Sequence, residues 1–389
     1  MKVLHVIPSV ADRSGGPATA IVPMCRALMN QDVEILLLST TAGLNGQRSV
    51  FEQKGVPGIL FPVRLSESFK YSRPLASWLK TNVNGFNAVH IHAVFNHSSV
   101  AAAQACYQAE VPYVIRPLGT LDPWSLSQKS WRKNLFWHLA GNKMLRRAAA
   151  IHYTSETEKL ATEASLGLNH GQVVALGIES NAANPSDLGH FFPQLAGEPY
   201  VLVLSRLHPK KNLDVLIDAF AAVAERVRFA RWRLVLAGDG PTDYVGKLKS
   251  RAAAASLNER IIFTGWLENE RKNAVLSGAS LLALPSQQEN FGLCVMEALS
   301  RSVPVLISPN VNLAPEIAAT NSGWIAAIDK DSLSEKLAEA MSDNYELGKR
   351  GRAGKQLSQK YSWDETARQL IELYRSVIER NGSARVHRV

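Results

Sequence analysis

Glu289 and Glu297 flank the start of a predicted helix and could hold two ends of one polar ligand. An apolar run just upstream predicts a buried strand, and Asn290 predicts the N-cap of a helix that begins near Phe291. Glu297 then lies nearly two turns into the helix, about 10 Å from Glu289 between Cα atoms at ~1.5 Å rise per residue. That separation is too long for a shared proton. Between the carboxylates, the unpaired N–H groups of Phe291 and Gly292 suit hydroxyl or phosphate oxygens.

The alternative for these two carboxylates is ordinary solvation, with Glu289 on a loop and Glu297 on an exposed helix face. Leu293, Met296 and Leu299 form the apolar face of the predicted helix, and Glu297 follows Leu293 by four positions. Glu297 therefore lies on or near the buried stripe, where an unpaired carboxylate is costly. This position favours a ligand-binding role.

Two cations lie on another predicted strand-to-helix loop. Arg206 and Lys211 follow the predicted strand 200–204, and Asn212 predicts the cap of an amphipathic helix. An arginine fork and a lysine point charge at a positive helix end can clamp a pyrophosphate. A solvated basic loop is the alternative, and the position directly after a strand makes it the weaker one.

Glycine turns follow two further predicted strands. Gly15 and Gly16 lie between the strand 3–7 and a helix, where glycines let a phosphate approach the backbone. Gly238 and Gly240 begin a turn that resembles a dinucleotide fingerprint, but its sixth position is not glycine, so NAD is not predicted. Either turn is a weak signal by itself.

Histidines occupy the carboxyl end of the predicted strand 89–94. His90 and His92 share one face of the sheet, and His92 and His97 are better placed for a ligand, because open α/β folds bind ligands beyond the carboxyl ends of their strands. A helix-capping or core histidine is an equal alternative at this point. Zinc is not expected, because no third ligand of suitable spacing follows.

Composition places these residues in a two-domain protein. The chain has 389 residues, which is long enough for two domains, and its predicted strands alternate with helices, which indicates a parallel α/β architecture. Its net charge of +9 predicts an anionic partner. The three cysteines have no metal-like or redox spacing and are expected to be reduced core thiols. The N-terminus is unlike a signal peptide, and no apolar run reaches the length of a membrane span. A cytoplasmic protein, at most resting on a membrane, is expected.

A basic, aromatic segment lies between Asp122 and Glu156, which bracket a stretch without acidic residues. Interfacial helices combine cations and aromatic rings in this way, so docking on an anionic membrane is one hypothesis, and packing of the rings in the core is the other. Nucleic acid is not expected, because no recognised motif accompanies the charge. The residues are Lys129, Arg132, Lys133, Lys143, Arg146 and Arg147, with Trp124, Trp131, Phe136 and Trp137 among them.

The E-x7-E pattern after a strand ending in Pro-Ser, together with R-x4-K-N and H-x-H, resembles the signature of the retaining glycosyltransferases of family 4. The resemblance implies an α/β fold of GT-B architecture, with two Rossmann-like domains, a cleft between them and a C-terminal helix that crosses back to the first domain. The expected boundaries are 1–184 for the acceptor-side domain, 196–362 for the nucleotide-sugar domain and 363–389 for the crossover helix and tail. A linker is expected within 181–199.

The resemblance also implies roles for the candidate residues. The second histidine of H-x-H, His92, should face the donor sugar, and Glu297 should hold the ribose hydroxyls. Arg206 and Lys211 should neutralise the leaving diphosphate. The remaining donor contacts are implied for Glu289 with Asn290, Phe291, Gly292 and Leu293 at the sugar, Trp266 and Leu267 at the nucleobase, and the turns of Gly238 with Gly240 and of Gly15 with Gly16.

The implied activity is retaining transfer of a hexose, best matched by glucose from UDP-glucose, to a glycan or lipid-linked acceptor in exopolysaccharide synthesis. The element R-P-x-G-x-x-x-P-W from Arg116 resembles bacterial surface-glycan transferases and is expected on the acceptor side. No cofactor or metal is expected to be required, because N-capping explains the D-x-D of Asp329 and Asp331. The alternatives are a nucleotide-sugar epimerase of the same architecture and a non-catalytic membrane-associated interaction protein.

Overall fold

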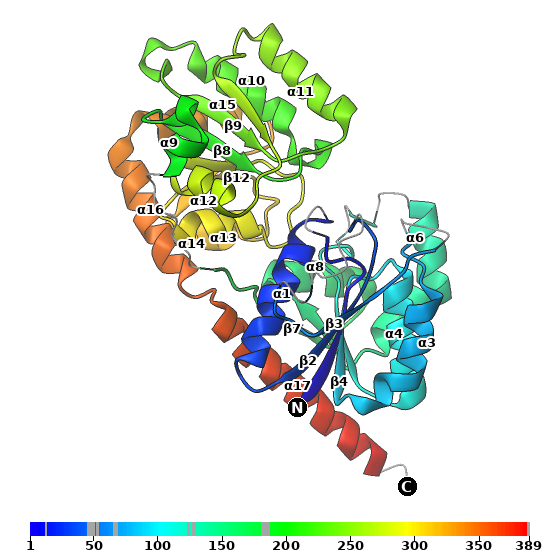
Figure 1. The fold of residues 1–389 in the computed structure, drawn as a ribbon. Helices are drawn as coiled ribbons and strands as arrows, with labels where there is room; N and C mark the ends of the chain where they lie inside the picture. Colours follow the sequence, from blue (N-terminus) through cyan, green and yellow to red (C-terminus); the bar gives the residue numbers. More distant parts are fainter. Residues whose placement is uncertain are drawn as a thin grey trace. The chain divides into compact units, whose positions relative to one another are not determined.

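The computed structural model describes residues 1–11, 14–44, 51, 54–64, 69–122, 125–126, 130–179 and 187–386. The chain divides into two compact units, unit 1 (Met1–Gly177 with Trp363–Val389) and unit 2 (Ile178–Ser362). In each unit, helices cover a twisted sheet whose strands are all parallel (Figure 1). Two Rossmann-like α/β units are therefore present, as expected.

Unit 1 contains a seven-stranded sheet in the order β3-β2-β1-β4-β5-β6-β7. Its strands are β1 (Lys2–Val6), β2 (Glu34–Thr40), β3 (Gly58–Phe61), β4 (Ala88–His92), β5 (Tyr113–Arg116), β6 (Ala150–Tyr153) and β7 (Gly171–Val173). Its helices are α1 (Gly16–Met29), α3 (Arg73–Asn82), α4 (His97–Ala109), α6 (Ser130–Phe136), α7 (Asn142–Arg146), α8 (Glu156–Leu166) and α17 (Trp363–Val386), with a π-turn η3 (Trp137–Gly141) between α6 and α7 and a 3-10 turn η2 (Val83–Gly85).

Alternation along β4 gives the two faces of this sheet different chemistry. Val89 and Ile91 belong to an apolar cluster that includes leucines of α3 and alanines of α4. His90 and His92 point to the opposite face, because successive side chains of a strand alternate. His90 there meets Tyr374 of α17. One face of the sheet is therefore an ordinary apolar core, and the other carries buried polar rings.

The C-terminal helix α17 is part of unit 1 and lies beside α1 (Figure 1). The amide of Gln31 donates to the carbonyl oxygen of Asp364 at 2.8 Å, and the hydroxyl of Thr366 donates to that of Ala175 at 2.9 Å. Near the other end of α17, the amide of Asn381 donates to the carbonyl oxygen of Glu110 at 3.0 Å. The helix is therefore attached to unit 1 along most of its length.

Unit 2 contains a six-stranded sheet in the order β10-β9-β8-β11-β12-β13. The strands are β8 (Tyr200–Leu204), β9 (Arg233–Ala237), β10 (Ile261–Gly265), β11 (Leu281–Leu284), β12 (Val305–Ile307) and β13 (Gly323–Ile325). The helices are α9 (Asp187–Phe191), α10 (Leu213–Ala224), α11 (Thr242–Ala254), α12 (Asn269–Ser277), α13 (Leu293–Ser300), α14 (Ala314–Thr320), α15 (Lys330–Ser342) and α16 (Asn344–Ser358), with 3-10 turns η4 (Pro193–Leu195), η5 (Pro209–Lys211) and η6 (Val227–Phe229).

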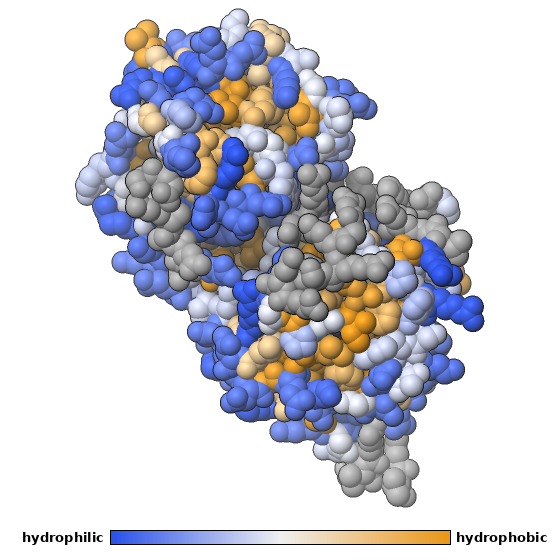
Figure 2. Space-filling view, in the orientation of Figure 1, coloured by the Kyte–Doolittle hydropathy of each residue, from blue (hydrophilic) through white to orange (hydrophobic). Residues whose placement is uncertain are grey.

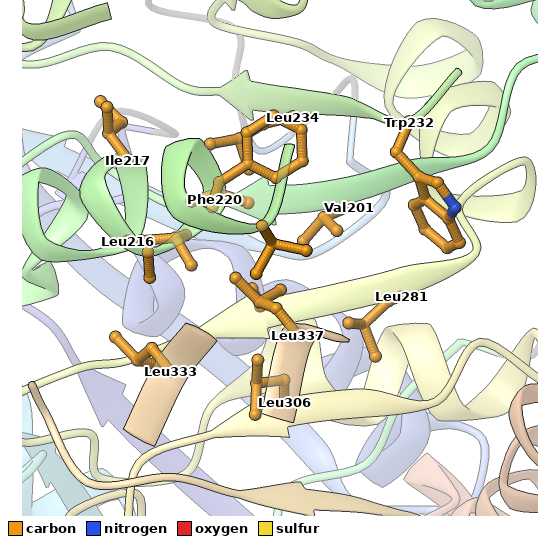
Figure 3. Packing of buried hydrophobic residues seen from close by; sticks show 14 of the residues in the cluster. Val201, Leu216, Ile217, Phe220, Trp232, Leu234, Leu281, Leu306, Leu333 and Leu337 are labelled. Atoms are coloured by element: carbon orange, nitrogen blue, oxygen red, sulfur yellow. The ribbon is translucent and has the colours of Figure 1, made fainter. Parts of the chain in front are cut away.

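The core of unit 2 lies between its sheet and the helices α10 and α15. Leu216 and Phe220 of α10 meet Leu333 and Leu337 of α15 above the strand residue Val201, and all five side chains are fully buried (Figure 3). The amphipathic helix expected after Asn212 is therefore present as α10, and its apolar face is buried because it meets the sheet. The valine that follows α10, Val227, is 90% exposed, since it lies in the separate turn η6.

The expected linker is replaced in part by regular structure. Residues 187–191 form α9, which contacts α12, and residues 193–195 form η4. Residues 180–186 lie outside the described part of the chain. Leu188 and Leu195 are buried in unit 2, which explains why a segment rich in turn-forming residues still folds onto the domain.

Part of the surface of unit 1 is apolar at the sheet edge formed by β2 and β3. Figure 2 shows an orange, hydrophobic area over these strands. A groove at this edge is lined in part by Ile35, Leu36, Pro57 and Trp78. No described helix has both the length and the apolar composition that crossing a bilayer requires. Two of the three cysteines, Cys25 and Cys106, are buried thiols as expected, and Cys294 is half-buried.

Candidate active site

Two carboxylate–lysine pairs lie on either side of Cys294, near the start of α13. Lys211 donates to Glu289, and Lys272 of α12 donates to Glu297 at 2.7 Å. All four side chains are half-buried. Burial raises the pKa of the Cys294 thiol to about 12, and the charges of Glu289 and Glu297 add to this effect. The thiol therefore stays protonated at neutral pH, and both carboxylates are held in place rather than freely solvated.

The loop that carries Glu289 is fixed by backbone pairing. The N–H group of Glu289 donates to the carbonyl oxygen of Asn310 at 3.2 Å, and its own carbonyl accepts from the N–H group of Asn312 at 3.1 Å. Upstream, the side-chain amide of Asn212 donates to the carbonyl oxygen of Pro285 at 2.9 Å. These bonds position the carboxylate without using its own oxygens, which leaves them for Lys211 and a ligand.

The helix behind this loop begins two residues later than predicted. Gly292 is the N-cap of α13, with φ of 71°, and Asn290 does not cap the helix. Glycine accepts this left-handed conformation without the penalty that a side chain brings. The backbone N–H groups of Leu293 and Cys294 consequently have no acceptor in the described part of the chain and are available to an anion or a hydroxyl.

Cations gather on the loop after β8. Arg206 is exposed, Lys211 pairs with Glu289, and Lys210, which the sequence pattern did not single out, donates to Gln288. Burial lowers the pKa of His208, and the positive charges of Arg206, Lys210 and Lys211 lower it further. The depressed pKa of this histidine indicates a positive field on the loop, which suits a pyrophosphate.

Asn212 takes the N-cap position of α10, as predicted, but it does not act as the expected side-chain cap. Its φ is 49°, and its side chain makes no capping hydrogen bond. The amide is instead directed to the Pro285 carbonyl, so Asn212 joins two loops of the site. This tertiary bond was not predictable from local helix signals.

Gly238 and Gly240 allow the turn after β9 to approach the loop after β8. A Cβ atom at Gly238 would lie 1.8 Å from the carbonyl oxygen of Ser205, and one at Gly240 would lie 1.9 Å from that of Leu207. The N–H group of Leu207 donates to the carbonyl oxygen of Asp239 at 2.8 Å, which joins the two loops. These glycines therefore have a structural reason to be present, whether or not a nucleotide also touches them.

Trp266 and Leu267 follow β10 at the same edge of the sheet. Leu267 is buried, while Trp266 is half-buried and its indole N–H donates to Glu268 at 2.8 Å. The N–H group of Gly238 donates to the carbonyl oxygen of Gly265 at 2.9 Å and ties this loop to its neighbour. The candidate residues of unit 2 thus lie beyond the carboxyl ends of β10, β9, β8 and β11, four adjacent strands.

In unit 1, the glycine turn and His97 have structural explanations of their own. Gly15 is the N-cap of α1 with φ of 94°, and Gly16 is the first helical residue. His97 accepts from the backbone N–H group of Ser72 at 3.3 Å and packs on Tyr71. His97 therefore fastens two elements of unit 1.

His92 is fully buried within a group of polar rings, and its Nδ1 atom has no hydrogen-bond partner in the part of the chain that the structure describes. Its Nε2 atom lies 3.0 Å from Nδ1 of His5, which comes from the adjacent strand β1. The sequence offers no third ligand of suitable spacing after His92, but the sheet brings His5 of β1 beside His90 and His92. Ring nitrogens of His5, His90 and His92 lie within 4.8 Å of one another.

A buried arginine accompanies these histidines. Arg116 is the cross-strand partner of His92 and is 1% exposed. Burial lowers its pKa to about 10, so it remains charged at neutral pH, helped by Glu158. Burial and the Arg116 charge lower the pKa of His5 to about 3 and that of His152 to about 3. Burial also lowers the pKa values of His90 and His92 well below the ordinary range, so all four rings are neutral at pH 7.

Two family models match the chain, one in each unit. The model described as Glycosyl transferase 4-like domain matches residues 15–178, and the model described as Glycosyl transferases group 1 matches residues 190–359. Together they span most of the sequence.

Relatives align over part of the chain. Mannosylfructose-phosphate synthase from Agrobacterium fabrum is 28% identical over 179 residues, 44% of this chain and 39% of that protein. The GDP-mannose-dependent alpha-(1-6)-phosphatidylinositol monomannoside mannosyltransferase of Mycobacterium tuberculosis is 29% identical over 192 residues, 47% of this chain and 49% of that protein. The aligned part thus spans less than half of either relative.

Solved structures align over nearly all of the chain. Anabaena HepE in complex with UDP and glucose superposes with a TM-score of 0.80 at 21% identity, over 97% of this chain and 100% of that chain. Sucrose-phosphate synthase from Thermosynechococcus elongatus superposes with a TM-score of 0.79 at 17% identity, over 97% of this chain and 99% of that chain. At these identities the likeness concerns the fold. The two family models, one in each unit, both describe glycosyl transferases, and the fold is that of GT-B glycosyltransferase structures.

The close approach at Gly238 predicts a large cost for any side chain there. Gly238→Ala should lower the free energy of unfolding by more than about 2 kcal/mol, because Cβ would overlap the Ser205 carbonyl oxygen and φ is +146°. Gly246→Ala is the matched control, since a Cβ there meets nothing within 4 Å inside α11. It should stabilise by about 0.5–1 kcal/mol. Urea unfolding measures both, and a neutral Gly238→Ala would contradict the close-packing argument.

The buried neutral histidines predict acid sensitivity of unit 1. Unfolded histidines take up protons near pH 6.5, whereas the folded rings stay neutral until far lower pH, so acid favours the unfolded state. Stability is fully present above this pH and should fall as pH drops below it, by about 1.4 kcal/mol per pH unit for each ring. Hydrogen exchange should show peptides of β4 losing protection between pH 7 and pH 5. Peptides of β8 are the control, because no described histidine of unit 2 is fully buried as those of unit 1 are. Equal losses in both units would contradict the prediction.

Proposed function

We propose that this chain transfers a hexose from a nucleotide sugar, with UDP-glucose as the preferred donor, to a glycan or lipid-linked acceptor, with retention of the anomeric configuration. The observation that carries the proposal is the pair of lysine-bound carboxylates, Glu289 and Glu297, at the two sides of an open helix N-terminus. Carboxylates so placed accept hydrogen bonds from hydroxyls at both ends of a sugar nucleotide.

At the nucleoside end, Glu297 is proposed to accept from the ribose hydroxyls. Its bond to Lys272 orients the carboxylate without occupying both oxygens. The backbone around Trp266 and Leu267, beyond β10, is proposed to contact the base. The uracil preference is part of the proposal and is supported by the UDP and glucose bound in the HepE structure.

At the diphosphate, Arg206 and Lys211 are proposed to balance the charge that develops when the bond from the sugar to the leaving oxygen breaks. A preorganised positive field is usually the largest single contribution to such catalysis. Lys210 adds to this field and is anchored by Gln288. The free N–H groups at the start of α13 offer further donors.

At the sugar, Glu289 is proposed to accept from hydroxyls, assisted by the backbone of residues 290–293. From unit 1, His92 is proposed to contact the same sugar, and the turn of Gly15 and Gly16 the phosphates. The Cys294 thiol is protonated and therefore unsuited to act as a nucleophile. The acceptor hydroxyl is then proposed to attack directly on the face that the diphosphate leaves, and to give its proton to the departing diphosphate oxygen, with no resident metal required.

The transferase is favoured over the epimerase alternative, because the relatives with assigned activities are named as sugar transferases or synthases. A role in exopolysaccharide or envelope polysaccharide synthesis in the cytoplasm remains the proposal for its pathway. The element that begins at Arg116 supports it only as a resemblance.

Association with the cytoplasmic face of an anionic membrane is proposed as part of this function. Trp131, Leu135 and Leu139 recur every four residues along α6 and η3, and they are 66%, 54% and 74% exposed. Exposed Lys143 and Arg146 lie on the same helical segment. An apolar stripe beside cations is the pattern of a helix that lies in a lipid interface.

Different residues of the basic, aromatic segment support different hypotheses, either membrane docking or packing in the core. Phe136 and Trp137 are half-buried against the apolar core of unit 1, which agrees with core packing. Lys133 donates to the Ser125 carbonyl oxygen and lies over the ring of Phe95, so it is a poor candidate for lipid contact. Trp124, Lys129 and the side chain of Arg132 lie outside the described residues.

Donor binding predicts thermal stabilisation by one class of nucleotide sugar. A ligand at 100 times its Kd stabilises by about 2.7 kcal/mol, so a panel of UDP-, GDP- and ADP-sugars, with and without Mg²⁺, should single out UDP-glucose. Arg206→Ala should remove the shift, whereas Arg226→Ala, at an exposed arginine elsewhere in unit 2, should keep it. Glu289→Gln should fold normally and lower kcat roughly 10²-fold or more. Near-normal turnover of Glu289→Gln, or no shift with any donor, would sink the proposal.

Membrane docking predicts that charge on the exposed stripe weakens lipid binding. Leu135→Glu with Leu139→Glu should reduce co-sedimentation with phosphatidylglycerol vesicles at least tenfold, because both side chains would leave the bilayer interface. Leu160→Glu is the matched control, a leucine of α8 in the same unit that is 66% exposed. Unchanged binding of the double variant, or equal loss in the control, would return the stripe to an ordinary exposed surface.

A further inference from the structure

Five rings in the core of unit 1 form one chain of hydrogen bonds. The chain runs from a backbone carbonyl to an unpartnered nitrogen, through side chains contributed by four different elements. In order, its members are the Val174 carbonyl, His152 of β6, His90 of β4, Tyr374 of α17, His5 of β1 and His92 of β4. Each ring is fully buried, so water does not compete for these bonds.

The direction of every bond follows from the first. A carbonyl oxygen can only accept, so Nε2 of His152 carries the proton and donates to Val174 at 2.7 Å. A neutral imidazole has one N–H group, so Nδ1 of His152 must accept. Nε2 of His90, 3.2 Å away, is therefore the donor to it. Nδ1 of His90 is then an acceptor and takes the proton of the Tyr374 hydroxyl at 2.7 Å.

The same logic continues beyond the tyrosine. Because the Tyr374 proton points to His90, the phenol oxygen presents lone pairs to Nε2 of His5, which lies 3.4 Å away and must donate. Nδ1 of His5 then accepts from Nε2 of His92 at 3.0 Å. All four histidines therefore carry their proton on Nε2.

The chain requires neutral rings, and the surroundings supply that condition. Burial and the nearby Arg116 charge lower the pKa values of His5 and His152 to about 3. The pKa values of His90 and His92 are lowered by the same causes and by the neighbouring rings. The other titratable groups that face the chain are Tyr374, Cys25 and, beside Arg116, Glu158. Burial raises the pKa values of Tyr374 and Cys25, which keeps both protonated.

We propose that this chain locks His92 in its Nε2–H tautomer, so that its Nδ1 atom is an obligate hydrogen-bond acceptor for a hydroxyl of the bound substrate. Nδ1 of His92 has no partner among the described residues although it is fully buried. It lies on the last residue of β4, at the sheet edge where α/β folds bind ligands. His5, His90, His152 and Tyr374 are then positioning residues that act through His92.

The neighbouring unpartnered group explains why the ligand is a hydroxyl. Nε of Arg116, the cross-strand partner of His92, is a donor that is also buried and has no hydrogen-bond partner among the residues described. A hydroxyl can donate to His92 and accept from Arg116, whereas a carbonyl can only accept and an ammonium group can only donate. The assignment of this hydroxyl to the donor sugar rests on the proposed function.

A metal ion is the competing use of these rings. His5, His90 and His92 could each direct one nitrogen at a common ion. The ring nitrogens that face one another are already engaged in the chain, and the charge of Arg116 opposes a second cation in the same core. The hydrogen-bond chain therefore leaves fewer unpaired polar groups in this core than a metal ion bound by the three histidines would.

The tautomers can be measured directly on the full chain. In a sample with ¹⁵N-labelled imidazoles, two-bond ¹H–¹⁵N correlations separate Nε2–H from Nδ1–H rings, and single histidine substitutions assign the signals. His5, His90, His92 and His152 should all show the Nε2–H pattern, unchanged from pH 8 to pH 5.5. An Nδ1–H, mixed or titrating pattern for His92 would overturn the proposal. So would stoichiometric Zn²⁺ binding that replaces these patterns.

Substitution of the tyrosine tests the direction of the chain. Tyr374→Phe should leave His152 and His90 as Nε2–H rings, because Val174 still fixes them, while His5 and His92 become tautomer mixtures. Tyr113→Phe is the matched control, since Tyr113 is a buried tyrosine of the same unit whose hydroxyl donates to the Met144 carbonyl oxygen at 2.8 Å. It should lower Tm by a similar amount and leave all four histidine patterns intact. Identical histidine tautomer patterns in the two variants would contradict the proposed hydrogen-bond chain through Tyr374.

The proposed contact between His92 and a substrate hydroxyl can be tested separately. UDP-glucose should shift the Nδ1 resonance of His92, and UDP alone should not. The sugar nucleotide could stabilise the protein in the thermal assay while the Nδ1 resonance of an Nε2–H His92 stays unchanged. That result would overturn the proposal that a sugar hydroxyl is the ligand of His92. Absence of any thermal shift would instead count against the proposed function. The tautomer patterns would still test whether the chain of hydrogen bonds exists.

Discussion

Parallel strand pairing is the constraint on which both candidate sites depend. In a parallel sheet every strand ends at the same edge, so loops that are distant in sequence emerge side by side. In unit 2 this brings the loops after β8, β9, β10 and β11 together, and glycines at 238 and 240 let two of them touch through their backbones. In unit 1 it aligns His5 with His90 and His92 with Arg116.

The two units handle buried polar groups in opposite ways. Unit 2 pairs Glu289 and Glu297 with one lysine each, at positions that solvent still partly reaches. Unit 1 keeps its histidines neutral and satisfies them through one another, at positions that solvent does not reach. A charged site suits a diphosphate that must be bound and released, whereas a neutral site with fixed lone pairs suits discrimination among hydroxyl groups.

The errors of sequence reasoning share one cause, which is the use of local signals for tertiary positions. Asn290 and Asn212 are good capping residues, yet Gly292 caps α13 and the Asn212 amide bonds to another loop. Lys133 belongs to a basic run, but its ammonium group is engaged inside unit 1. Local spacing offered no third ligand after His92, because the third histidine, His5, lies 87 positions earlier in the sequence, on the strand that pairs with β4.

The sequence by itself determined the alternating α/β order, most strand positions, the loops that carry Glu289, Arg206 and Lys211, and the helix that carries Glu297. These features depend on local periodicity and on short motifs that a single segment contains. Only the tertiary structure decided that each carboxylate has a lysine partner, that Gly238 lies against the Ser205 carbonyl and that four histidines with Tyr374 share one core. Such pairings join residues up to 369 positions apart, and local sequence carries no record of which strands will be neighbours.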